Sequence, residues 1–354
     1  RNISVHFTRL RVGGVDFAIL EDRKFKTGPF GTIPQQGPRP DHINDPGYDP
    51  ASIDLPGLQL LGERQEKFLH DWHQDWRGAD LKAVLSGTAF AGAVHLHGQI
   101  TNRLLADLDC NGWPQAGRQR ALEEIRRARA VHICGDQHLA VVIKHGLGEF
   151  GDGPYGFTSP ALVNTIYGRW WHPEDEKPGA HPVPDSPLPW TGDYRDGLGN
   201  KISMLAYANP GNIRDEKRRG DGFGLIRFNK QDRTAAFECY PRFVTDDTPG
   251  GQFPGWPITI KMSDNDGRKP KAWLPELRFG RQTQNPVVQV INDATGEILY
   301  TIRIDGSRFQ PPVFASGNYT IKAGLDQPSE TVLTSQSASP DQAAAGRQRV
   351  RLSR

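Results

Sequence analysis

Residues 130–140, with the sequence AVHICGDQHLA, run from five mostly apolar residues into a glycine and then into two polar side chains, one residue apart. The apolar run predicts a strand buried on both faces, as in a parallel sheet. Gly135 allows the backbone to turn sharply where the strand ends. Asp136 and His138 then offer an oxygen and a nitrogen donor, which suit a borderline or hard metal ion. The pattern predicts two metal ligands at a sheet edge. The alternative is an ordinary surface loop, because this pair has no spacing specific to one mechanism.

Two earlier apolar runs, at residues 15–20 and 81–85, also predict buried strands. Amphipathic helices are expected from about residue 63 and over residues 117–129, so strands and helices alternate as in a mostly parallel α/β sheet. Ligands of such sheets bind beyond the carboxyl ends of the strands. Three predicted strands end in polar groups: Glu21-Asp22-Arg23, Ser86-Gly87-Thr88 and Asp136-Gln137-His138. If these strands are parallel neighbours, the groups share one crevice.

The second half of the chain predicts more β structure. Residues 151–210 are irregular and aromatic, which indicates either a functional loop or a structural cover over the sheet. Strands are expected at 202–206 and in a hairpin formed by 222–228 and 234–240. A composition shift near Asp246 indicates a linker, followed by a small all-β sandwich over 258–326. The predicted division is a first domain at 1–250, a β-sandwich domain at 251–326 and a disordered tail at 327–354.

Composition excludes several functions. The 354 residues include 43 Lys and Arg against 41 Asp and Glu, so a net charge of +2 predicts no nucleic-acid-binding patch. No stretch approaches the roughly 20 apolar residues of a membrane span. The three cysteines are too few for a disulfide framework, and Cys134 and Cys239 are expected to be buried free thiols. The chain begins with Arg1, without a signal-peptide pattern, so we expect a processed or truncated chain. Oligomeric state is left open.

The remaining histidines are weaker candidates than His138. His95 and His97 lie in a segment of unclear structure without an identifiable third ligand, and we expect them not to bind metal. His132 lies inside a predicted strand and is expected to be a packed core residue. A nucleophile elbow, a phosphate-binding loop and a dinucleotide glycine fingerprint do not occur in the sequence.

Five pieces of the sequence, in order over roughly residues 10–245, resemble the PhoD-like metallophosphatases, the alkaline phosphatase D family. These are Glu21 with Arg23, the helix start Leu60-Leu61-Gly62-Glu63-Arg64-Gln65-Glu66-Lys67-Phe68-Leu69, the segment Asp109-Cys110-Asn111-Gly112-Trp113 with Arg118, the motif Gly135 to His138, and the pair Thr158-Ser159.

The resemblance implies a layered αββα metallophosphatase-like sandwich, incomplete at its amino terminus, that hydrolyses phosphate monoesters or diesters with a pair of metal ions. Calcium and iron are the ions implied. By position, Asp136 and His138 would be catalytic metal ligands. Arg23 and Arg118 match family arginines and are candidate phosphate-binding residues, with an ion pair at the sheet edge as the alternative for both. An exported location is implied by the family alone.

The chain departs from the family at its start. The family's earlier ligands lie in motifs that do not occur before Val15, so the chain resembles the carboxyl-terminal portion of such an enzyme. Two protein ligands are too few for a hydrolytic metal pair, and we expect the chain alone to be inactive. The rival functions are a cell-surface or carbohydrate-binding structural module with a degenerate hydrolase domain, and another hydrolase class such as a metal-dependent amide hydrolase.

Overall fold

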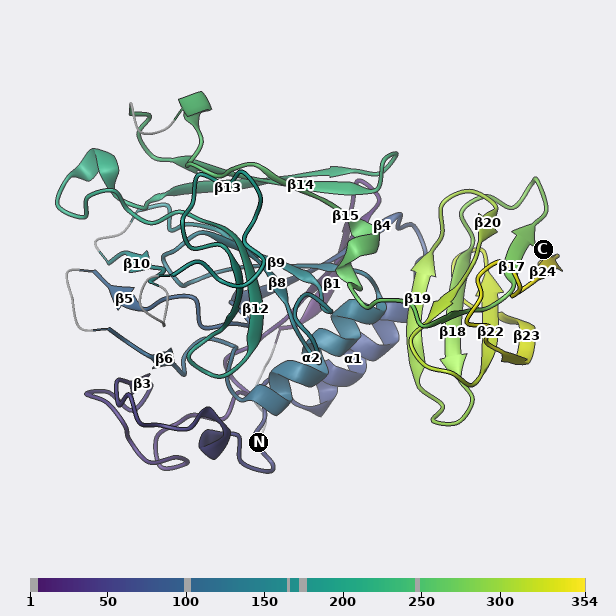
Figure 1. Ribbon diagram of the computed structural model, residues 1–354, viewed down its shortest axis with the longest axis horizontal. Helices are drawn as coiled ribbons and strands as arrows, with labels where there is room; N and C mark the ends of the chain where they lie inside the picture. Colours follow the sequence, from purple (N-terminus) through teal and green to yellow (C-terminus); the bar gives the residue numbers. More distant parts are fainter. Residues whose placement is uncertain (1–5, 99–102, 164–165, 172–176, 246–248, 354) are drawn as a thin grey trace.

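The computed structural model describes residues 6–98, 103–163, 166–171, 177–245 and 249–353 (Figure 1). Its main element is an eight-stranded sheet with the strand order β1-β2-β4-β7-β9-β8-β12-β11. In that order, the strands are Thr8–Val12, Val15–Ile19, Leu81–Thr88, Val131–Gly135, Tyr155–Thr158, Val141–His145, Lys201–Tyr207 and Gly192–Arg195.

The centre of this sheet is parallel. β2 pairs with β4, β4 with β7, and β7 with β9, all in the parallel sense, whereas the flanking pairs are antiparallel. The prediction that the three apolar runs form neighbouring parallel strands is therefore confirmed. Their polar ends meet at one edge of the sheet, together with Thr158 and Ser159 at the end of β9.

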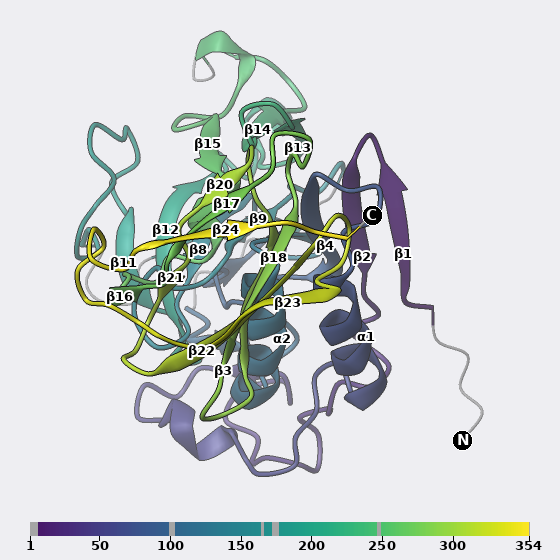
Figure 2. The ribbon, with the colours of Figure 1, turned by 90° about the vertical axis from the view of Figure 1, so that its right-hand side faces the viewer.

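Two α-helices, α1 (Glu63–Gln74) and α2 (Gln115–Arg127), lie side by side on one face of the sheet, as Figure 2 shows. Leu69 and Trp72 of α1 and Leu122 and Ile125 of α2 are buried against the sheet with Val84 of β4. Each large apolar side chain buried in this way contributes about 1.5–3 kcal/mol. Both helices begin within two residues of the expected positions.

The opposite face of the sheet is covered by a second sheet, which consists of β13 (Gly222–Asn229), β14 (Thr234–Pro241) and β15 (Ile258–Lys261). Phe157 of the main sheet stacks on Phe237 of β14, with ring centroids 5.4 Å apart. The described residues thus form three layers, one helical and two of β-sheet. They make a mostly β fold in which the second helical layer of the expected αββα arrangement is not seen.

The predicted boundary at residues 250 and 251 is corrected by β15, because this strand pairs with β14 of the first domain. Phe253 and Trp256, in the predicted linker, are buried in the same core as Phe237. Residues 246–248, where that linker was expected to begin, lie outside the described residues. The proline and glycine content that predicted a linker instead marks ordered turns.

The carboxyl-terminal part is the predicted β-sandwich, with a core that includes Val288, Tyr300 and Ile321. Its strands are β16 (Ala272–Trp273), β17 (Glu276–Phe279), β18 (Val287–Asn292), β19 (Ile298–Arg303), β20 (Arg308–Phe309), β21 (Pro312–Val313), β22 (Asn318–Gly324), β23 (Glu330–Ser337) and β24 (Arg347–Val350). The expectation of a disordered tail over 327–354 is wrong, because β23 pairs with β22 and β24 pairs with β17. Both strands lie at sheet edges and expose many polar side chains, which gave the segment a composition typical of disorder.

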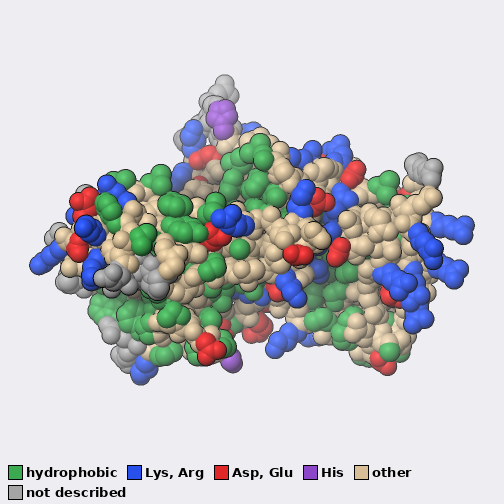
Figure 3. All heavy atoms as spheres, turned by 90° about the horizontal axis from the view of Figure 1, so that it is seen from above, with side chains coloured by type: hydrophobic (Ala, Val, Ile, Leu, Met, Phe, Trp, Pro, Cys, Tyr) green, Lys and Arg blue, Asp and Glu red, His purple; other side chains and the backbone are tan. Residues whose placement is uncertain are grey.

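The sandwich packs against the end of the helical layer. Trp76 and Ala79, which follow α1, belong to the sandwich core, and Arg127 of α2 donates to the Ile298 carbonyl at 2.9 Å. Seen from above in Figure 3, Lys and Arg side chains gather at the sandwich end, where Arg347 and Arg349 of β24 are exposed. Among the described residues no helix is both long enough and apolar enough to span a membrane.

At the other end of the molecule lie four two-residue strands, labelled in Figure 1. They are β3 (His42–Ile43) paired with β6 (Ala106–Asp107), and β5 (Leu96–His97) paired with β10 (Gly168–Arg169). Short 3-10 helices span Pro50–Ile53, Glu216–Arg218, Pro249–Gly251 and Met262–Asn265.

Candidate functional site

Thr88, the last residue of β4, is the centre of a polar cluster at the carboxyl edge of the parallel strands. Its backbone N–H donates to Asp22 Oδ2 at 3.0 Å, and its hydroxyl accepts from Gln137 Nε2 at 3.1 Å. Asn111 Nδ2 donates to the same Asp22 oxygen at 2.5 Å. The loops after β2, β4 and β7 therefore meet as predicted, and Asn111 joins them from the loop between β6 and α2.

This cluster has more acceptors than donors. The side chains of Asp22, Asn111 and Gln137 are all buried. The amide nitrogens of Asn111 and Gln137 are engaged as described, but Asn111 Oδ1 and Gln137 Oε1 are buried without a hydrogen-bond partner. A buried acceptor without a donor costs about 1–3 kcal/mol. Such oxygens beside a carboxylate suit a hard cation, which would satisfy them.

Arg23 links two carboxylates at the mouth of this cluster. Its Nη2 donates to Asp136 Oδ2 at 2.6 Å, and its Nη1 donates to both the carboxylate and the carbonyl of Asp109. The side chains of Arg23 and Asp136 are 37% and 39% exposed, so a ligand from solvent can reach the guanidinium. Glu21, the acid that the sequence motif singled out, instead accepts from the backbone N–H groups of Arg23 and Lys24. Asp22, rather than Glu21, is the acid buried at the edge.

The Asp136-Gln137-His138 loop has an unusual backbone. Asp136 and His138 adopt φ angles of 69° and 53°, in the left-handed region that non-glycine residues rarely occupy. Each such residue costs on the order of 1–3 kcal/mol, and such strain clusters at functional sites. The loop is fixed by the hydrogen bond from the Gly168 N–H to the His138 carbonyl, at 3.0 Å. The structure therefore presents Asp136 and His138 on either side of the buried Gln137.

A second group of possible ligands borders this loop. One donor atom from each of His42, His97 and Asp107 lies within 4.8 Å of the others. Burial lowers the pKa of His97 to about 4, with His42 and His138 as further causes, so His97 and His138 are neighbours. Asp107 is connected to the cluster because its carboxylate accepts from the Asp109 N–H at 2.9 Å. The expectation that His97 lacks a third ligand is not met, since β3 and β6 supply two candidates.

Lys26 fixes the loop that carries Asp109 and Asn111. Its ammonium donates to the carbonyls of Leu108, Asp109 and Cys110 at 2.8, 2.8 and 2.7 Å. Three donors of one ammonium thus meet three successive carbonyls, which holds the loop in a defined turn. The segment that resembles the family's Asp-rich motif is therefore part of the candidate site.

Arg118 lies apart from this edge. It is 2% exposed and donates to the Phe90 carbonyl at 2.7 Å, and its guanidinium lies 3.3 Å from His145 Nδ1. Burial lowers its pKa to about 10. These contacts are those of a structural arginine, and phosphate binding by Arg118 stays a prediction. His132 is buried in the core as predicted, and all three cysteines are buried free thiols.

A third cluster, His70, His73 and Glu124, lies between α1 and α2. His73 Nδ1 is 2.8 Å from one Glu124 oxygen, and Arg127 donates to the other. The Glu124 charge is therefore already paired with a cation of the chain.

Comparison with known proteins gave a structural match but no sequence match. No protein-family model matches the chain, and no curated protein matches it. A solved structure described as "Structure of PhoD" is similar to the chain, with a TM-score of 0.41 and 13% identity over 72% of this chain and 40% of that one. The chain thus corresponds to less than half the length of that structure.

Proposed function

We propose that the carboxyl edge of the parallel strands is the active site of a metal-dependent phosphoesterase, which hydrolyses phosphate monoesters or diesters in the protein that carries this chain. The observation that supports this most is the acceptor-rich cluster around Thr88, with Arg23 at its mouth. Unsatisfied oxygens beside carboxylates favour cations, and a guanidinium within reach of solvent favours a phosphate group.

The proposed roles follow from the contacts. Asp136 and His138 would hold metal through a carboxylate oxygen and a ring nitrogen, and Gln137 would orient the loop between them. Arg23 would turn from Asp136 to the substrate phosphate while Asp109 keeps the guanidinium at the mouth. Two bound ions, calcium and iron by resemblance, would generate a hydroxide nucleophile and neutralise phosphate charge.

The number of protein ligands at this edge limits how many metal ions the chain can hold. Hydrolytic metal sites usually have three or more protein ligands for each ion. Asp136, His138 and Asp22, even with the unpartnered oxygens of Asn111 and Gln137, offer fewer ligands than two ions require. We therefore propose that the chain alone is inactive and that further ligands come from polypeptide outside the described residues. An exported location belongs to the same proposal, by family resemblance.

The test uses the whole polypeptide that carries this chain. Metal content is measured by mass spectrometry, and hydrolysis is measured with p-nitrophenyl phosphate, bis-p-nitrophenyl phosphate and a p-nitroanilide. We expect bound metal and phosphoester hydrolysis that Asp136→Asn and His138→Ala reduce by at least about 100-fold. The matched controls are Asp193→Asn and His181→Ala, an Asp–His pair 2.9 Å apart elsewhere in the chain.

Normal phosphoesterase activity in both Asp136 and His138 variants would overturn the assignment. Hydrolysis of the anilide alone would favour the amide hydrolase, and a metal-free protein without hydrolytic activity would favour the structural module.

A further inference from the structure

Main-chain pairing of four short strands brings His42, His97 and Asp107 together. β3 and β6 pair in the register that places His42 opposite Asp107. β5 pairs with β10, where His97 lies opposite Gly168. The Leu105 N–H donates to the Ile43 carbonyl, and the Leu104 N–H to the His95 carbonyl, both at 2.8 Å. The backbone positions of the three residues are therefore set by main-chain hydrogen bonds.

The spacing of the three donors is close to that of a mononuclear metal site. His97 Nε2 lies 3.8 Å from Asp107 Oδ2, and the rings of His42 and His97 stack with centroids 5.7 Å apart and 12° between their planes. All three donor atoms lie within 4.8 Å of one another. Ligand atoms on one tetrahedral zinc ion are roughly 3.3 Å apart, so small side-chain shifts would complete the site.

The local environment leaves these donors available. His97 Nε2 is buried and has no hydrogen-bond partner. Asp107 is 6% exposed, and its N–H···O contact with Asp109 uses Oδ1, the oxygen that does not face His97.

We propose that His42, His97 and Asp107 bind a divalent first-row transition-metal ion at a site that borders the Asp136-Gln137-His138 loop but uses none of its side chains as ligands. Two imidazoles and one carboxylate form a donor set for zinc, cobalt(II) or iron(II), whereas calcium and magnesium prefer oxygen ligands alone. Three protein ligands leave at least one position for water. Metal binding here does not depend on the proposed phosphoester hydrolysis.

The His70, His73 and Glu124 cluster provides a control within the same chain. It has the same donor types, but Arg127 already pairs with its carboxylate. His70→Gln removes one possible ligand there, and His70 is 46% exposed, which makes this change easy for the fold to accept.

The experiment measures metal binding without substrate. The chain is stripped with a chelator, and Zn²⁺ binding is followed by calorimetry and Co²⁺ binding by visible absorption. We expect one tight Zn²⁺ site and the absorption of four- or five-coordinate Co²⁺. His97→Gln and Asp107→Asn are expected to weaken Zn²⁺ binding by at least about 100-fold, because losing even an outer partner of a ligand costs about 10–100-fold. His70→Gln is expected to bind this Zn²⁺ as wild type does.

A second measurement needs no substitution. Zn²⁺ is expected to protect His42 and His97 from modification by diethylpyrocarbonate, as read by mass spectrometry, and to leave His181 reactive. The proposal would be overturned if the folded His97 and Asp107 variants bound Zn²⁺ as wild type does. It would also be overturned if Zn²⁺ protected His70 and His73 instead, or protected no histidine. Because no phosphoester is present, failure here is distinct from absence of phosphoesterase activity.

Discussion

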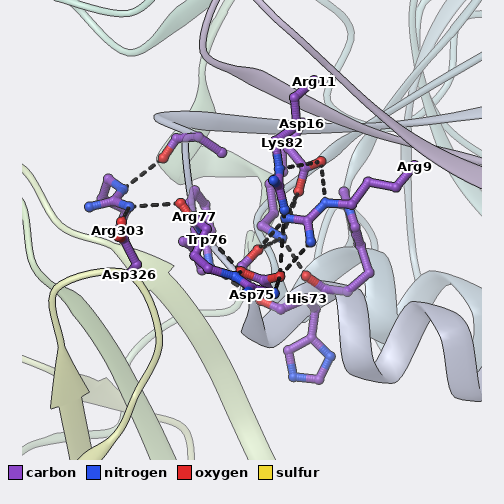
Figure 4. A network of polar contacts seen from close by, with 12 residues as sticks. Arg9, Arg11, Asp16, His73, Asp75, Trp76, Arg77, Lys82, Arg303 and Asp326 are labelled. Atoms are coloured by element: carbon purple, nitrogen blue, oxygen red, sulfur yellow. Dashed lines mark hydrogen bonds and ion pairs between the residues drawn. The ribbon is translucent and has the colours of Figure 1, made fainter.

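Lys82 and Asp16 form an ion pair that is fully buried on both sides, with Nζ 3.4 Å from Oδ2 (Figure 4). Lys82 also donates to the carbonyls of Trp72 and Asp75, so its three N–H groups face three acceptors. Arg9 binds the same Asp16 carboxylate at 2.6 and 2.5 Å. The network joins β1, β2 and β4 to the end of α1.

Replacing Asp16 by Ala is expected to lower the free energy of unfolding by about 3–5 kcal/mol, because Lys82 is then buried without its counter-charge. Urea unfolding measures the loss. The control is Asp71→Ala, which breaks an exposed pair with Lys67 on α1 and should cost less than about 0.5 kcal/mol. Equal losses in the two variants would show that the buried network contributes no more than a surface pair.

Acid sensitivity is expected to come in part from His132. Burial, with the Arg118 charge as a second cause, lowers its pKa from 6.5 to about 3 in the folded protein. The unfolded chain therefore binds more protons below pH 6.5, and stability falls as the pH falls from 6.5 toward 3. The full slope is about 1.4 kcal/mol per pH unit for one group.

The measurement is the free energy of unfolding as a function of pH for His132→Gln and Phe90→Leu. Phe90 packs against the His132 ring with centroids 4.6 Å apart, so its variant disturbs the same place without removing a titrating group. Both variants should be less stable than wild type near neutral pH, but only His132→Gln should have a shallower acid slope. A parallel slope in His132→Gln would contradict the assignment.

A strand could be predicted from the sequence where its apolar run was long enough to be recognised. β2, β4 and β7 are apolar runs that end in polar residues, and their shared edge follows from their parallel pairing. β9 was missed because Tyr155–Thr158 contains only four residues inside an irregular region. β23 and β24 are exposed edge strands, whose polar residues resemble those of a disordered tail.

The candidate site was predictable only in part, for a related reason. Each of Arg23, Asp136 and His138 lies within four residues of a strand end, so the apolar run before it indicated its place in the sequence. His42, His97 and Asp107 come from two-residue strands that have no periodicity of their own, so only the folded chain shows that they meet. The choice of Asp22 over Glu21 likewise depends on which carboxylate the Thr88 N–H reaches.

Arg303 is expected to couple the sandwich to the rest of the molecule. It donates to the carbonyls of Trp76 and Ala79, both at 2.7 Å, and bonds to Asp326 at 2.7 Å. Arg303→Gln leaves the Ala79 carbonyl without its Arg303 donor and the Trp76 carbonyl with the Ala79 N–H alone, and it should cost about 2–4 kcal/mol. We expect calorimetry to show the sandwich unfolding separately, ahead of the main sheet. Arg308→Gln, an exposed change on β20, serves as the control, and a single unshifted transition in the Arg303 variant would contradict the coupling.

Arg23 provides the sharpest test of the proposed phosphate site. Arg23→Gln removes the guanidinium that spans Asp109 and Asp136, and Arg23→Lys keeps the charge but cannot reach both carboxylates in the same way. In the complete protein we expect kcat/KM for phosphoesters to fall by at least about 10-fold in Arg23→Gln and by less in Arg23→Lys, mainly through KM.

Stability separates this role in binding from a structural one. Because Arg23 and its partners are well exposed, its removal should change the free energy of unfolding by less than about 1 kcal/mol. Arg120→Gln, which breaks an exposed ion pair with Glu66 outside the site, should leave both kinetics and stability near wild type. Unchanged KM in Arg23→Gln, together with a large loss of stability, would identify Arg23 as a residue that only holds the sheet edge together.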